Sequence, residues 1–171
     1  MPKPMRPLQT RRMWLWHVGQ YWLPPLFWMA VMCGLSTDTF AAEHTGGVLW
    51  YVFQELAPRA TYEHYPLLHF CIRKAAHLTE YAILAYLLLR AFRAGAAVSW
   101  HWRWATFSLL LVAIYAGLDE YHQTFTQSRT GSVSDSLLDI AGGLLALLWL
   151  GLRWYVRRST STPAAAPERF S

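Results

Sequence analysis

The stretch from Asp119 to Gly142 reads DEYHQTFTQSRTGSVSDSLLDIAG and places acids, a histidine and an arginine between two apolar segments. Ala105 to Leu118 precedes it and Ile140 to Trp154 follows it, and both are apolar enough to sit in lipid. The polar residues therefore lie at the ends of predicted membrane helices. Ionisable side chains are costly there, so a functional site is the default interpretation.

The composition supports a membrane location. The chain has 171 residues, of which 54% are hydrophobic, and it contains 10 Trp, 9 Tyr and 8 Phe. This excludes an ordinary soluble domain and predicts a small polytopic membrane protein. The formal net charge is +5, but the basic residues form short clusters between apolar segments, which indicates membrane orientation rather than nucleic-acid binding. Cys33 and Cys71 have no zinc or redox spacing, so we propose no thiol mechanism.

Four apolar segments are each close to the roughly 20 residues that span a bilayer, namely 14–35, 66–92, 104–121 and 133–154. The predicted fold is therefore an all-α bundle of four transmembrane helices. A basic N-terminus, 1–13, precedes this membrane domain of 14–154, and a tail, 155–171, is predicted to be disordered. Pro24 and Pro25 should kink or split the first helix.

Lysine and arginine residues predict the orientation. They gather before the first helix, between the second and third, and after the fourth, so these regions and both termini should be cytoplasmic. The segment 36–65 and the loop after Tyr121 should face outward. Within the first of these, Val48 to Leu56 has apolar residues at helical spacing, which predicts a short amphipathic helix on the outer leaflet.

This topology brings the start of the second helix, the end of the third and the start of the fourth to one depth, near the outer surface. In the second helix, spacings of three and four residues place Arg73, His77 and Glu80 on one face. Gly142 and Gly143 should let another helix approach closely. The candidate ligand-binding residues are Arg73, Lys74, His77, Glu80, Asp119, Glu120, His122, Gln123, Arg129, Ser132, Asp135 and Asp139.

Three interpretations of this cluster remain open. The charges can neutralise one another and fix the helix register, which makes the cluster a structural helix-packing module. His77 with Glu80, and His122 with Asp119, can serve as acid–base pairs, so these four are the catalytic candidates. The same four residues have a spacing that permits metal binding, but the neighbouring Arg73 would repel a dication, and we predict no metal and no cofactor.

At these residues the chain resembles the VanZ-like family of bacterial membrane proteins. The family pattern has Lys-x-x-His-x-x-Glu-Tyr, then Asp-Glu-x-His-Gln-x-Phe, and then Arg-x-x-Ser-x-x-Asp with a glycine after it. The matching residues here are Lys74, His77, Glu80, Tyr81, Asp119, Glu120, His122, Gln123, Phe125, Arg129, Ser132, Asp135, Asp139 and Gly142. The resemblance extends from about residue 23 to 150. One departure is Gln127, where many relatives have a proline.

The resemblance implies a multi-pass protein of the bacterial cytoplasmic membrane, and the family's namesake is linked to resistance to teicoplanin-type glycopeptides. It does not imply an established biochemical activity. Our leading hypothesis is an outward polar pocket that recognises an anionic lipid headgroup or a lipid-linked wall precursor, with Arg73, Lys74 and Arg129 holding the anion. Membrane lipids are the expected partners, and nucleic acid is not. The alternatives are a membrane-embedded hydrolase or transferase and the structural module.

Overall fold

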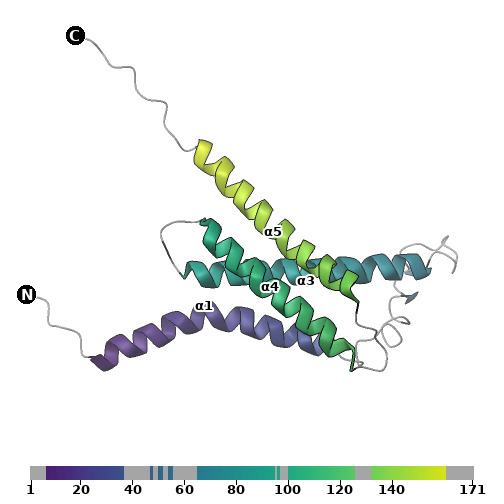
Figure 1. Ribbon diagram of the computed structural model, residues 1–171, viewed down its shortest axis with the longest axis horizontal. Helices are drawn as coiled ribbons and strands as arrows, with labels where there is room; N and C mark the ends of the chain where they lie inside the picture. Colours follow the sequence, from purple (N-terminus) through teal and green to yellow (C-terminus); the bar gives the residue numbers. More distant parts are fainter. Residues whose placement is uncertain are drawn as a thin grey trace, which may run out of the picture.

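The computed structural model describes residues 7–36, 47, 50–51, 54–55, 65–94, 96, 100–125 and 132–160. Within these residues the fold is all-helical, and no strand occurs. The four long helices are α1 (Pro7–Leu35), α3 (Tyr65–Arg93), α4 (Trp102–Gln123) and α5 (Val133–Thr160). Figure 1 shows α4 crossing α3 and ending beside the end of α1, while α5 diverges from α3 toward its C-terminus. The all-α prediction is confirmed.

The helices extend past the apolar segments that predicted them. α1 begins at Pro7 rather than at residue 14, and α5 continues to Thr160 rather than ending at 154. Arg157 and Arg158 occupy the last turn of α5, where cations interact favourably with the helix dipole. The predicted disordered tail is therefore helical at its beginning, and 161–171 lies outside the described residues.

Pro24 and Pro25 lie inside α1, which continues past them to Leu35 and is not split. The helix arches in Figure 1. α4 begins at Trp102, and the preceding His101 caps it, because the backbone N–H of Arg103 donates to the His101 Nδ1 at 3.3 Å. Of the predicted amphipathic helix at Val48 to Leu56, only four residues are described, all helical, and the rest lies outside the described residues.

One of the described helices, α5, is long and apolar enough to cross a membrane by length and composition alone. The bundle of four spans therefore stays a prediction. Polar residues explain the difference for α3, which carries Arg73, Lys74 and Glu80 within its sequence. Much of the apolar surface of α5 is exposed, including Leu137, Leu145 and Leu152, as expected for a helix whose solvent is lipid.

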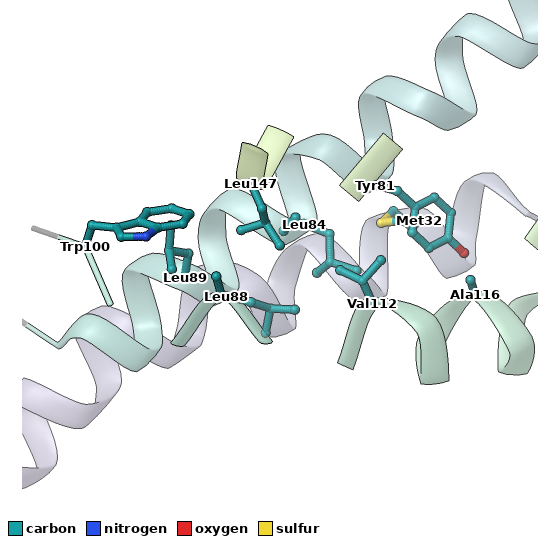
Figure 2. Close-up of a cluster of buried hydrophobic side chains, with 11 residues drawn as sticks. Met32, Tyr81, Leu84, Leu88, Leu89, Trp100, Val112, Ala116 and Leu147 are labelled. Carbon is teal, nitrogen blue, oxygen red and sulfur yellow. The ribbon is translucent and has the colours of Figure 1, made fainter. Parts of the chain in front are cut away.

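The packing of α3, α4 and α5 forms most of the fold, and their directions alternate along the chain. α3 and α5 run parallel and make the most extensive contact, and α4 runs antiparallel to both. The buried core between them contains Tyr81, Leu84 and Leu88 from α3, Val112 and Ala116 from α4, and Leu147 from α5 (Figure 2). α1 adds Met32 to this core. This packing holds the ends of three helices together at one end of the bundle.

Gly142 and Gly143 of α5 lie at close contacts with neighbouring helices, as predicted. A Cβ atom added to Gly142 would lie 2.5 Å from the carbonyl oxygen of Leu78 and 2.9 Å from its Cα. A Cβ atom on Gly143 would lie 2.9 Å from the Cγ1 of Val112. α5 therefore meets the backbone of α3 at Gly142 and a side chain of α4 at Gly143. This close contact sets the distance across which the polar side chains of α3 and α5 face each other.

Candidate functional site

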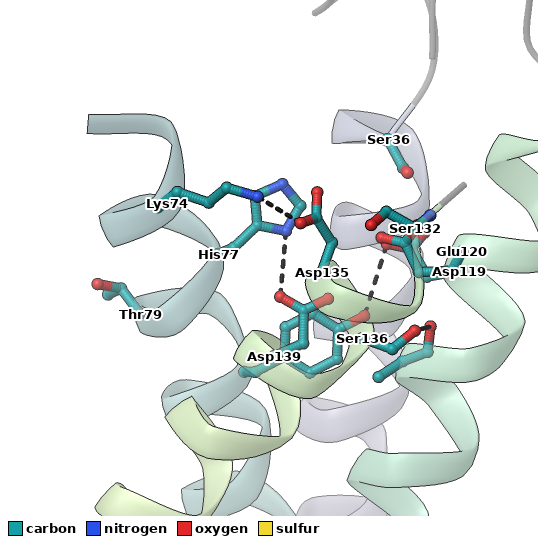
Figure 3. A network of polar contacts seen from close by, with 12 residues as sticks. Ser36, Lys74, His77, Thr79, Asp119, Glu120, Ser132, Asp135, Ser136 and Asp139 are labelled. Carbon is teal, nitrogen blue, oxygen red and sulfur yellow. Dashed lines mark hydrogen bonds and ion pairs between the residues drawn. The ribbon is translucent and has the colours of Figure 1, made fainter. Parts of the chain in front are cut away.

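Polar side chains from α3, α4 and α5 converge at the end of the bundle where α3 begins, α4 ends and α5 begins (Figure 3). The prediction that these three helix ends meet is confirmed. The cluster contains two ion-pair contacts between α3 and α5 and a set of hydrogen bonds around the end of α4. It forms a polar layer beside the hydrophobic core.

The first ion pair joins the Lys74 Nζ to the Asp135 Oδ1, and both side chains are about one quarter exposed. Lys74 also lies over the Phe70 ring, with its Nζ 5.4 Å from the ring centroid. Beside this pair is a pocket of about 240 Å³ lined by Pro66, His69, Phe70, Arg73, Lys74 and Asp135. Two cations and one carboxylate therefore line the same small cavity.

The second ion-pair contact joins His77 of α3 to Asp139 of α5, with 3.3 Å between the His77 Nδ1 and the Asp139 Oδ1. Asp139 is completely buried, and neither of its carboxylate oxygens has a hydrogen-bond partner among the described residues. The contact is therefore within ion-pair distance but is not aligned as a hydrogen bond. A buried carboxylate in this position depends on its histidine neighbour for electrostatic compensation.

Asp119 forms the centre of a hydrogen-bonded group that reaches α1. The Gln123 Nε2 donates to the Asp119 Oδ2 and to the Ser36 Oγ, both at 3.1 Å. The Tyr81 hydroxyl lies 3.5 Å from the same Asp119 oxygen. In addition, the Tyr115 hydroxyl donates to the backbone carbonyl of Met29 at 2.6 Å. These contacts tie α1, α3 and α4 together.

Glu120 links the end of α4 to the start of α5. Its Oε2 accepts a hydrogen bond from the backbone N–H of Ser132 at 2.6 Å, next to the N-terminus of α5, where negative charge is favourable. The other oxygen, Oε1, is buried without a hydrogen-bond partner among the described residues. The Ser132 and Ser134 hydroxyls are 2.6 Å apart. Glu120 thus positions the first turn of α5.

Three of the predicted site residues remain, His122, Glu80 and Arg129. His122 is exposed, and no contact of its side chain with Asp119 is found. Glu80 is partly buried, and its backbone carbonyl accepts from the Trp28 Nε1 at 3.0 Å. Arg129 lies outside the described residues. Among the part of the chain that the structure describes, no group of three or more His, Cys, Asp or Glu residues is placed to hold a metal ion.

The family model for VanZ/LLP1 matches residues 21–153, which include every polar contact described above. This chain belongs to the VanZ/LLP1 family. VanZ/LLP1 proteins are membrane proteins of the cell envelope, and the apolar helix α5 agrees with that assignment. No curated protein and no solved structure matches the chain.

The structure of this VanZ/LLP1 protein adds three residues that the set of candidate site residues omitted. Ser36 and Tyr81 join the Asp119 group, and His69 lines the pocket beside Lys74. Tyr81 could have been added from the family pattern, which contains it. His69 lies one helical turn before Arg73, so helical spacing could have identified it as well. Helical spacing does not indicate the contact between Ser36 and Gln123, because the two residues are 87 positions apart.

Proposed function

We propose that this VanZ/LLP1 protein is a four-span protein of the bacterial cytoplasmic membrane whose polar end faces outward and recognises an anionic lipid headgroup or a lipid-linked wall precursor. The observation that carries the proposal is the pocket of about 240 Å³ beside the Lys74–Asp135 pair. Arg73 and Lys74 line it together with His69, and Asp135 is its one carboxylate. The lining has a net positive charge even with a neutral histidine, which suits a phosphate group.

The pocket is also suited to a lipid by its apolar residues. Pro66 and Phe70 line it beside the cations, and Phe70 is largely exposed on the outside of α3. A lipid can therefore place its phosphate against Arg73 and its glycerol and first acyl carbons against Phe70. Lys74 is already paired with Asp135, so Arg73 is the side chain best placed to contact the anion, and Lys74 adds charge from one side.

The proposed orientation rests on the arginine distribution. Arg90 and Arg93 end α3, and Arg157 and Arg158 end α5, all at the end of the bundle opposite the polar cluster. Basic residues concentrate on the cytoplasmic side of membrane proteins, which puts the cluster outside. Lipid-linked wall precursors are exposed on that side, so a role of this pocket in teicoplanin-type resistance is part of the proposal.

Retention of an anionic lipid should fall when Arg73 is replaced by glutamine. A surface arginine contributes about 1 kcal/mol to binding an anionic lipid, which corresponds to about a fivefold loss of affinity for phosphatidylglycerol. The measurement is native mass spectrometry of the purified full chain titrated with this lipid, compared between wild type and Arg73→Gln. The matched control is Arg103→Gln, which removes the same charge from an exposed position at the start of α4.

Equal retention by wild type and Arg73→Gln contradicts the anion pocket and favours the structural packing module. Equal losses in Arg73→Gln and Arg103→Gln indicate unspecific charge attraction and contradict it as well.

The side of the membrane that the polar end faces is checked by labelling intact cells after Cys33 and Cys71 are replaced. A cysteine at Thr130 should react with a membrane-impermeant maleimide, whereas one at Gly95 should react only after the membrane is opened.

The His77–Asp139 contact favours acid–base catalysis as a second candidate function. A buried aspartate near Nδ1 can orient an imidazole so that its other nitrogen, Nε2, takes a proton from a bound substrate. This candidate requires turnover of a lipid-linked phosphate ester that is lost in His77→Gln while helix content and lipid retention persist. Finding no product from folded wild type with headgroup and polyprenyl diphosphate substrates contradicts it.

A further inference from the structure

A second and larger cavity lies at the opposite end of the bundle from the polar cluster. Its volume is about 520 Å³, within the usual range for ligand pockets. α1, α3 and α5 and the residue Trp100 before α4 contribute its walls. It is lined by Tyr21, Tyr86, Leu89, Arg90, Arg93, Trp100, Leu150, Arg153, Trp154 and Arg157.

The charge of this lining has one sign. Four arginines line the cavity, and the lining contains no aspartate or glutamate. The described contacts of three of them are with rings or backbone rather than with carboxylates. Arg90 lies over the Tyr21 ring at 5.4 Å, Arg153 lies over the Trp149 ring at 5.2 Å, and the Arg93 Nε donates to the Ala96 carbonyl at 3.4 Å.

Helix-end effects account for part of this arrangement. Arginines in the last turns of α3 and α5 interact favourably with the helix dipoles and mark the cytoplasmic side of a membrane protein. Neither effect requires arginines on two different helices to surround one cavity, where their like charges repel. An anion in the cavity would remove that repulsion and would meet several guanidinium groups at once.

One aromatic wall of the cavity, Trp100, is tightly packed. Trp100 is only 5% exposed, and a Cβ atom added to Gly151 would lie 2.8 Å from its Cζ2. The indole therefore packs directly on the backbone of α5. Leu89, Leu150 and the Trp154 ring add apolar surface next to the guanidinium groups. A cationic rim with an apolar wall fits a phosphate group that is attached to hydrocarbon.

We propose that this cavity, which we call the arginine pocket, binds a phosphate ester anion, and that its source is an anionic phospholipid of the leaflet at this end of the bundle. Basic pockets between membrane helices on the cytoplasmic side are known to bind lipid headgroups of this class. The arginine pocket shares no residue with the pocket at Arg73 and is independent of the function proposed for that pocket.

The test uses the purified full chain in phosphatidylcholine nanodiscs that contain a minor fraction of diphosphatidylglycerol. Removing one pocket charge in Arg153→Gln should weaken retention of that lipid about fivefold, and Arg90→Gln with Arg153→Gln should weaken it about thirtyfold. Arg103→Gln removes the same charge from an exposed position that does not line the pocket, and its retention should equal that of wild type. Inorganic pyrophosphate serves as the soluble probe.

Several outcomes would overturn the proposal: equal losses in Arg103→Gln and Arg153→Gln, no loss in the double variant, or no binding of either probe by wild type. Saturable pyrophosphate binding that depends on Arg153 without lipid retention supports a phosphate pocket but assigns it a soluble ligand. If the double variant does not fold, cross-linking of wild type with a photoactivatable diphosphatidylglycerol is the test. Cross-links should map to 86–93 and 150–157, and cross-links at 66–74 alone contradict the arginine pocket.

Discussion

Gly142→Ala should destabilise the protein more than any other substitution that adds a single methyl group to a described glycine. The new Cβ would lie 2.5 Å from the Leu78 carbonyl oxygen, and neither backbone can rotate away as a side chain can. α3 and α5 must therefore separate, which also pulls Lys74 away from Asp135. We expect a loss of about 3 kcal/mol in the free energy of unfolding, at the upper end of the usual cost of overpacking.

The measurement is reversible unfolding of the purified chain in mixed micelles of mild detergent and dodecyl sulfate, followed by circular dichroism. Gly117→Ala is the matched control, because a Cβ there meets nothing within 4 Å and the position is exposed on α4. Alanine favours the helix over glycine, so this control should be neutral or gain up to about 1 kcal/mol. Equal changes in the free energy of unfolding at both glycines would show that the close helix contact at Gly142 does not affect stability.

His77→Leu should be the most damaging change among the polar residues. It leaves Asp139 completely buried beside an apolar side chain, and breaking a buried ion pair in this way costs about 3–5 kcal/mol. Asp139→Asn should cost less, because it removes the buried charge itself and leaves a neutral amide next to the imidazole. We therefore expect the double variant His77→Leu with Asp139→Asn to be more stable than the sum of the two single effects predicts.

The same unfolding measurement gives the coupling energy from this double-mutant cycle. Thr79→Ala is the control on α3, because Thr79 is exposed and its hydroxyl donates only to the Ala75 carbonyl of its own helix. Its effect should lie within about 0.5 kcal/mol of zero. Additive effects of the His77 and Asp139 substitutions would falsify the claim that these two residues compensate each other.

The positions of the helices were predictable from the sequence because each helix contains an apolar segment of about 20 residues. The positions of α3, α4 and α5 agree with the predicted segments, and only their ends differ. Those ends depend on caps and charges, such as His101 before α4 and Arg157 near the end of α5, which a measure of apolar length does not detect. The number of membrane spans stays a prediction, since among the described helices α5 alone is long and apolar enough to cross a membrane.

The meeting of the polar helix ends followed from the predicted topology, and the close approach at Gly142 followed from its small size. Pairing partners did not follow, because three- and four-residue spacing reports only neighbours on one helix. Spacing placed Glu80 near His77 on the same helix, but it could not identify Asp139 on α5, which lies 3.3 Å from His77. The arginine pocket does not follow from the sequence either, because arginines at helix ends indicate only the orientation of a membrane protein.

The Lys74–Asp135 pair also has a consequence for the order in which the protein is assembled during synthesis. The two residues are 61 positions apart, and at roughly 5–20 residues per second Asp135 is made about 3–12 s after Lys74. If α3 spans the membrane as proposed, it is released from the ribosome with Lys74 and His77 before either has its carboxylate. The insertion machinery or the headgroup region must accommodate these side chains until α5 arrives. α5 is thus the helix whose arrival allows α3 to reach its final depth in the membrane.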